Sequence, residues 1–309
     1  MTQSTKSNPK PRPDPHVRFV FDAIGTKWRI DLFQALRSKR IDQLHRAIRA
    51  RIETFDAQYS RFRDDSFVSE MSRRAGEYTL SADARPMLDL YAELYRVTDG
   101  LVTPLVGRLL VEAGYDANYS FRPGTLHRPL SWDEVLEYQF PKLTVRRPVL
   151  LDFGAAGKGY LVDIIGGVLE AHGVGDYSID AGGDILHRGH SQPLRVGLEH
   201  PGDTQQAIGV ATIANQSICA SAPTRRKWGA FHHIMDPKRL ESVQGVRAVW
   251  TVANTALLAD ALATCLFFVP PAALQTRYTF AYALVADDFS LTHSADFPAT
   301  FFTTKGSSA

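Results

Sequence analysis

The chain has 309 residues, of which 44% are hydrophobic and 22% are charged, and its formal net charge is +2. This composition is typical of an ordinary globular protein that forms one large domain or two modest ones. A charge balance so close to neutral gives no electrostatic argument for a nucleic-acid partner, and we expect none.

The two cysteines and the first residues of the chain indicate which kinds of site and which cellular location to expect. Cys219 and Cys265 do not form a CxxC pair, which argues against a zinc site or a disulfide framework. Residues 1–16 are polar and rich in proline, so we expect a disordered tail before a single domain over residues 17–309, possibly with two subdomains. We find no signal segment, lipid-attachment cysteine or membrane-spanning apolar run, and we therefore expect a cytoplasmic protein without a stable membrane span.

The first third of the chain predicts one strand pair followed by helices. Residues 17–33 alternate apolar and polar side chains around a glycine, which predicts a hairpin or bent pair of strands. Residues 41–59 carry an apolar stripe at helical spacing. Residues 59–73 mix arginine, aromatic and acidic side chains and predict a loop or a short helix, and a serine at 81 caps a helix that runs to about residue 97.

The middle of the chain passes from loops into a regular strand, turn and helix. Residues 114–147 are loop-rich, with one short helix near residues 131–138. The segment "PVLLDF" (148–153) predicts a strand, "GAAGKG" (154–159) a turn, and residues 160–173 a helix.

Strand patterns dominate the rest of the chain. We predict a strand with an internal glycine turn over residues 176–189, a helix over 255–268 and one last strand over 278–288. Further strands are predicted at residues 194–200, 207–221 and 230–237. Clustered strands with a few flanking helices indicate an α+β fold with mixed or largely antiparallel sheets.

The turn in "LDFGAAGKGYLVD" (151–163) is the first candidate for chemistry. It fails the P-loop pattern, because Asp152 stands where a glycine is needed and Gly159 follows the lysine. Glycines still allow close backbone approach, and a helix N-terminus attracts phosphate, to which Lys158 would add a positive charge. The alternative is a plain strand-to-helix turn with an exposed lysine.

A second glycine turn lies in "SIDAGGDI", where Gly182 and Gly183 separate Asp180 from Asp184. Glycines at a strand bend indicate either a close ligand or a simple tight turn, and both interpretations stay open.

A carboxylate in the apolar helix 255–268 is the third candidate. Asp260 and Thr264 are four residues apart and share one helix face. Together with a backbone carbonyl they suit a hard cation such as Mg²⁺. The alternative is a carboxylate that is bonded to the backbone or to an arginine.

The segment "FHHIMDP" offers the acid–base candidates. In a strand one of His232 and His233 faces inward, where it could transfer a proton, and Asp236 follows closely. A structural histidine is the alternative.

Taken in order, these segments resemble the FAD:protein FMN transferase (ApbE) family. The resemblance spans nearly the whole chain from about residue 21. Residues 59–73 resemble "FSTYRPDSELSRLN", residues 151–163 resemble "IDLGGIAKGYAVD", and the segment "IDAGGDILHRG" resembles "VDAGGDIRALG". The helix 255–268 resembles "DSMLADALATALF", and "HHIMDPK" resembles "HIIDPRTG".

The resemblance implies an enzyme that binds FAD with Mg²⁺, cleaves the pyrophosphate, links FMN to a Ser or Thr of a target flavoprotein and releases AMP. It implies that Asp260, Thr264 and the carbonyl of Gly157 bind the metal, and that His233 and Asp236 approach the pyrophosphate. The FAD contacts that it implies are Ile24, Phe62, Leu101, Val102, Thr103, Gly154, Tyr160, Ile234 and Ala263.

The chain departs from the family pattern at several of these places. Ile24 replaces a methionine, residues 101–103 lack a carboxylate, and residues 221–229 read "SAPTRRKWG" where the family has "SGDYERYF". Two other activities are therefore weighed beside the transferase: hydrolysis of FAD to FMN and AMP, and flavin binding without turnover.

Overall fold

The computed structural model describes residues 14–190 and 192–302. Of the predicted tail, residues 1–13 lie outside the described part of the chain. His16 already belongs to the folded region, because its N–H donates to the Leu32 carbonyl at 2.9 Å and extends the first strand pair.

An eight-stranded sheet, in which every neighbouring pair is antiparallel, forms the centre of the molecule. Its order is β1-β2-β6-β7-β10-β15-β16-β17. The strands are β1 (Val17–Ala23), β2 (Thr26–Leu32), β6 (Tyr177–Ala181), β7 (Ile185–Arg188), β10 (Ser217–Ser221), β15 (Val246–Ala253), β16 (Ala281–Ala286) and β17 (Leu291–His293).

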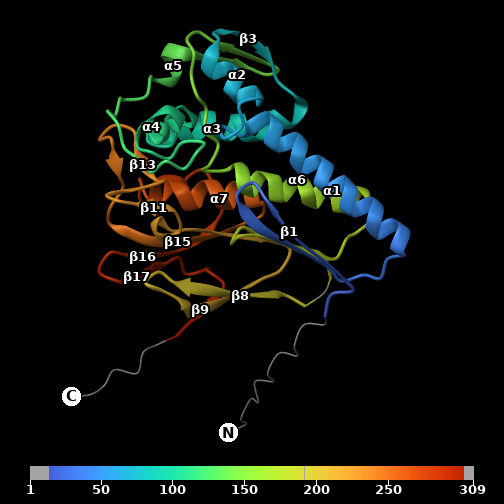
Figure 1. The fold of residues 1–309 in the computed structure, drawn as a ribbon. Helices are drawn as coiled ribbons and strands as arrows, with labels where there is room; N and C mark the ends of the chain where they lie inside the picture. Colours follow the sequence, from blue (N-terminus) through green and yellow to red (C-terminus); the bar gives the residue numbers. More distant parts are fainter. Residues whose placement is uncertain (1–13, 191, 303–309) are drawn as a thin grey trace, which may run out of the picture.

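Three helices cover one face of this sheet and a small sheet covers the other (Figure 1). The helices are α1 (Ser38–Tyr59), α6 (Gly157–Ala171) and α7 (Ala256–Cys265). The small sheet has the order β18-β9-β8, with β8 (Leu194–His200), β9 (Asp203–Ile213) and β18 (Ala299–Phe301). Separate apolar clusters fill the two layers, since α1, α6 and α7 pack in one and β8 and β9 in the other.

The remaining elements build the upper part of Figure 1 and the end of the sheet. Helices α2 (Phe67–Arg73), α3 (Arg85–Val97), α4 (Gly107–Glu112) and α5 (Trp132–Val135) lie with the three-stranded sheet of β3 (Gly76–Thr79), β4 (Leu136–Gln139) and β5 (Lys142–Val145). Two short hairpins, β11 (Lys227–Trp228) with β12 (Phe231–His232) and β13 (Met235–Asp236) with β14 (Glu241–Ser242), precede β15, and α8 (Pro271–Gln275) follows α7.

The predicted α+β class with antiparallel sheets is confirmed, while four of the predicted strands were wrong in detail. Residues 230–237, predicted as one strand, form β12 and β13, which belong to two separate hairpins. Residues 148–153 form no strand, because their backbone bonds to loops instead, as in Asp152 N–H to the Pro104 carbonyl at 2.7 Å. Residues 207–221 are two strands, which a turn with Asn215 at a φ of 53° separates. The strand β16 is not the last, since β17 and β18 follow it. In the described ranges, no helix has the length and apolar character needed to cross a membrane.

Candidate active site

The contact between α6 and α7 positions the candidate metal ligands. A Cβ on Gly159 of α6 would lie 2.2 Å from the Ala256 carbonyl oxygen, so only glycine allows the two helices to approach so closely. Asp163, one turn further along α6, accepts hydrogen bonds from the N–H groups of Ala256 at 2.9 Å and Leu257 at 2.7 Å. It thereby caps the N-terminus of α7 and fixes its start against α6.

This arrangement places Asp260 beneath the glycine turn. Asp260 is 4% exposed, and its Oδ2 accepts a hydrogen bond from the Gly159 N–H at 2.9 Å. Lys158 forms an ion pair with the fully buried Asp184 close by. Burial, followed by the negative charge of Asp184, raises the pKa of Asp260 well above its ordinary value. Burial acts to lower the pKa of Lys158, but the charges of Asp184 and Asp260 outweigh it and raise that pKa.

Oxygen atoms around Asp260 fit a hard divalent cation. Thr264, one turn after Asp260, directs its hydroxyl to the Ala155 carbonyl at 3.5 Å. Asp184 Oδ1 is buried and has no hydrogen-bond partner within residues 14–190 and 192–302. When Asp260 is ionised as well as Asp184, the single lysine leaves one negative charge unbalanced, and a cation here would balance it. Among the described residues, no three side chains of His, Cys, Asp or Glu come together as a metal cluster, so a cation here depends on hydroxyl and carbonyl oxygens as well.

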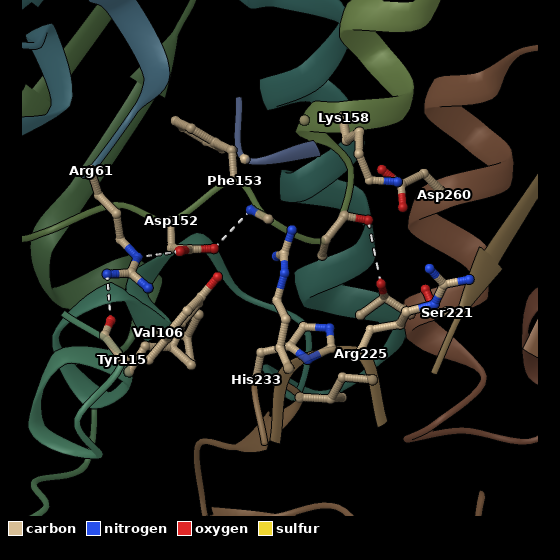
Figure 2. Close-up of a pocket in the computed structure, with 18 of the residues that line it drawn as sticks. Arg61, Val106, Tyr115, Asp152, Phe153, Lys158, Ser221, Arg225, His233 and Asp260 are labelled. Carbon is tan, nitrogen blue, oxygen red and sulfur yellow. Dashed lines mark hydrogen bonds and ion pairs between the residues drawn. The ribbon is translucent and has the colours of Figure 1, made fainter. Parts of the chain in front are cut away.

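A cavity of about 970 Å³ opens beside these groups. It lies between the glycine turn, α7, the loop after α1 and the segment that follows β10 (Figure 2). The predicted site residues that line it are Ile24, Phe62, Leu101, Val102, Thr103, Gly154, Gly157, Lys158, Gly182, His233, Ile234, Asp260 and Thr264. The structure thus brings together residues from seven separate segments of the chain.

Five predicted site residues lie outside the lining of this cavity. Tyr160 is buried and its hydroxyl donates to the Asp83 carbonyl at 2.6 Å. Ala263 is fully buried within α7. Asp180 accepts a hydrogen bond from the Gly183 N–H at 3.0 Å and forms an ion pair with Arg29 of β2. Asp180 and Gly183 therefore stabilise the turn between β6 and β7. Asp236 accepts backbone bonds from the turn that follows it.

The two neighbouring histidines have different surroundings. His232 is buried, and both its ring nitrogens bond to the backbone: Nε2 to the Val243 carbonyl at 2.8 Å and Nδ1 to the Ile234 N–H at 3.3 Å. His233 lines the cavity, and its Nδ1 has no hydrogen-bond partner among the described residues. Burial, together with the charge of Arg226, lowers the pKa of His233 to about 3, so that its imidazole is neutral near pH 7. His232 is therefore structural, whereas His233 is available to a ligand.

The structure adds residues that the sequence did not single out. Arg61 donates to Asp152 and to the Tyr115 carbonyl at one end of the cavity, as Figure 2 shows. At the other end Arg225 pairs with Glu199 at 2.8 Å. Arg61 lies in the segment "YSRFRDDS" that carried the family resemblance, but a single arginine among charged neighbours is usually a solvated surface residue.

Comparisons with known proteins agree with this geometry. The profile described as the ApbE family matches residues 24–280. The FAD:protein FMN transferase of Salmonella typhimurium is 24% identical over 270 residues, which cover 77% of this chain and 74% of that protein. The FAD:protein FMN transferase of Haemophilus influenzae is 26% identical over 250 residues, with 73% and 72% covered.

Two solved structures share the fold. The flavin transferase ApbE from Vibrio cholerae has a TM-score of 0.77 at 22% identity and covers 91% of this chain and 97% of its own. The ApbE protein from Thermotoga maritima has a TM-score of 0.78 at 20% identity, with 90% and 97% covered. Since the family profile spans most of the sequence, the resemblance predicted from the motifs is confirmed, and the chain belongs to the ApbE family.

Proposed function

We propose that this protein is a Mg²⁺-dependent FAD:protein FMN transferase, which attaches FMN to a Ser or Thr of a flavoprotein and releases AMP. The observation that carries the proposal is the convergence of Asp260, Thr264 and the glycine turn on one cavity of about 970 Å³. A cavity of that size lies at the upper end of the range for small-molecule sites and suits a dinucleotide. The names of the relatives support the same activity.

Asp260, Thr264 and a carbonyl of the turn, either Gly157 or Ala155, would hold the cation. Ala155 is included because the Thr264 hydroxyl faces its carbonyl. When bound, Mg²⁺ neutralises charge on the pyrophosphate oxygens. Helix α6 begins at Gly157, which lines the cavity, so the positive end of its helix dipole stabilises negative charge there.

His233 is the residue that we assign to the proton of the acceptor hydroxyl. Its neutral ring lines the cavity, and its Nδ1 has no partner in the described part of the chain, whereas Asp236 lies outside the lining and accepts backbone hydrogen bonds. Negative charge from a bound pyrophosphate favours protonated imidazole, so the basicity of His233 rises when the substrate is present. The hydroxyl oxygen then attacks the FMN phosphorus, its proton passes to His233, and AMP leaves.

The assay that tests the proposal combines the protein with FAD, Mg²⁺ and a candidate acceptor flavoprotein. A gain in acceptor mass equal to one FMN supports the transferase. Free FMN and AMP without that gain would make the protein a hydrolase, and unchanged FAD would make it a flavin-binding protein.

Asp260→Asn tests the metal role within the same assay. We expect it to abolish Mg²⁺-dependent turnover, because a neutral amide holds the cation more weakly. The control is Asp31→Asn, which alters a buried carboxylate of β2 that pairs with Arg18 at 2.6 Å and lies outside the cavity lining. If Asp260→Asn keeps full activity at limiting Mg²⁺, Asp260 is not a metal ligand.

A further inference from the structure

Arg61 is held rigidly at one end of the cavity. Its side chain is 2% exposed, its Nε donates to Asp152 Oδ2, and its Nη1 donates to the Tyr115 carbonyl at 2.8 Å. The guanidinium carbon lies 4.2 Å from the ring centroid of Phe62 and 4.9 Å from that of Tyr115. Two hydrogen bonds and two aromatic contacts leave this side chain little freedom to move.

One nitrogen of this fixed group is left without an acceptor. Arg61 Nη2 is buried and has no hydrogen-bond partner among the described residues. Buried donors of native proteins are nearly always paired, so a missing acceptor indicates a ligand or a water. Arg61 and its neighbour Phe62 both line the cavity, and Figure 2 shows Arg61 on the cavity wall between Asp152 and Tyr115. A molecule in the cavity can therefore supply the acceptor.

The surroundings of Nη2 define the chemistry of that acceptor. Asp152 already balances the charge of Arg61, and its second oxygen accepts the Gly154 N–H at 2.7 Å. A neutral acceptor, such as a carbonyl oxygen or a ring nitrogen, therefore suits this position better than a phosphate does. Beside it Phe62 and Tyr119 stack with an interplanar angle of 7° and a centroid distance of 5.5 Å, and Tyr119 is 46% exposed. These rings form an aromatic wall against which a flat ligand can pack.

We propose that Arg61 Nη2 donates a hydrogen bond to the edge of a planar heteroaromatic ring that packs against Phe62 and Tyr119. This inference rests on the proposed function, under which the ring is one of the two in FAD. Both the flavin and the adenine carry carbonyl oxygens or ring nitrogens at the edge. Arg61 is then a specificity-determining residue for one half of the dinucleotide.

The test is the affinity of Arg61→Lys for FAD, FMN and AMP, measured by titration calorimetry without any turnover. Lysine keeps the charge opposite Asp152 but lacks the planar fork, so it cannot make the three contacts together. The matched control is Arg63→Lys. Arg63 comes from the same segment and lines the same cavity, but its guanidinium is already paired with Glu53, Asp56 and Asp65.

We expect Arg61→Lys to weaken FAD binding by about 10- to 100-fold, the loss typical of a hydrogen bond from a charged group. We expect the same loss for one of FMN and AMP, which identifies the ring, and a change of less than about two-fold for the other ligand and for Arg63→Lys. If Arg61→Lys melts at a lower temperature, we replace it with the double variant Arg61→Met and Asp152→Asn. This variant removes both charges and so leaves neither of them unpaired.

Unchanged FAD affinity in the folded variant overturns the inference, and so does an equal loss for FMN and AMP. Either result leaves the proposed function intact, because the wild-type protein still binds FAD. Failure of the wild-type protein to bind FAD would instead reject the proposed function itself.

Discussion

A methyl group on Gly159 is the smallest change that should disturb the contact between α6 and α7. A Cβ at this position would lie 2.2 Å from the Ala256 carbonyl oxygen, 2.6 Å from the Asp260 Cβ and 2.7 Å from the Ala256 carbonyl carbon. Two of these atoms belong to the backbone of α7 and cannot rotate away. The helices must therefore separate, and the Gly159 N–H to Asp260 bond of 2.9 Å is lengthened.

Two opposing effects decide the sign of the change in stability. Alanine is a better helix former than glycine by about 1 kcal/mol, which favours the variant. Overpacking a close contact costs about 1–3 kcal/mol, and the lost support of a buried carboxylate adds to this cost. We therefore expect Gly159→Ala to lower the free energy of unfolding by about 1–2 kcal/mol and Tm by roughly 2–5 °C.

Gly167→Ala in the same helix is the matched control. A Cβ at Gly167 meets no atom within 4 Å, so the helix propensity acts alone and should raise the free energy of unfolding by about 0.5–1 kcal/mol. Thermal and urea unfolding followed by circular dichroism measure both variants. If Gly159→Ala is stabilised as much as Gly167→Ala, the two helices do not approach each other as described.

Two further predictions concern ionisation. Burial raises the pKa of Asp163 to about 6, so its folded form holds a proton more tightly than its unfolded form, and stability is lost as the pH rises from about 4 to 6. The free energy of unfolding of wild type relative to Asp163→Asn should fall by about 3 kcal/mol across that window and stay level above it; a level difference throughout would show that folding does not raise the pKa of Asp163. Burial and Arg226 lower the pKa of His233 to about 3, so its ring resonance in NMR spectra of the ligand-free protein, assigned with His233→Asn, should not titrate between pH 5 and 8. A midpoint near 6.5 would show that its surroundings do not lower the pKa of His233.

The sequence predicted the regular elements well, since their signals are local. The hairpin of β1 and β2, the apolar stripe of α1 and the helix α7 all follow from periodicity within a few residues. The segment 148–153 shows where such reasoning ends. A short buried apolar run satisfies a strand pattern, but here its backbone groups bond to distant loops that no local pattern reveals.

The sequence predicted a site residue where that residue is unusual for its own segment. Asp260 was visible as a carboxylate in an apolar helix, and it is indeed almost fully buried. Arg61 could not be recognised, because its burial depends on Asp152, which lies 91 residues away. Tyr160 and Asp236 occur in sequence stretches that resemble family motifs, but their side chains turn to backbone groups outside the cavity. A motif therefore locates a segment, whereas the fold decides which of its side chains reach the site.

The same contacts that hold α6 against α7 also set the geometry of the proposed metal site. Gly159 fixes how closely the helices approach, and Asp163 fixes the start of α7, so that Asp260 and Thr264 lie opposite the glycine turn. Neither Gly159 nor Asp163 lines the cavity. Any change that loosens this helix pair moves the carboxylate and the hydroxyl away from the turn carbonyls together. Packing and cation affinity are thereby coupled, since a site built from one carboxylate, one hydroxyl and a carbonyl depends on position more than on charge.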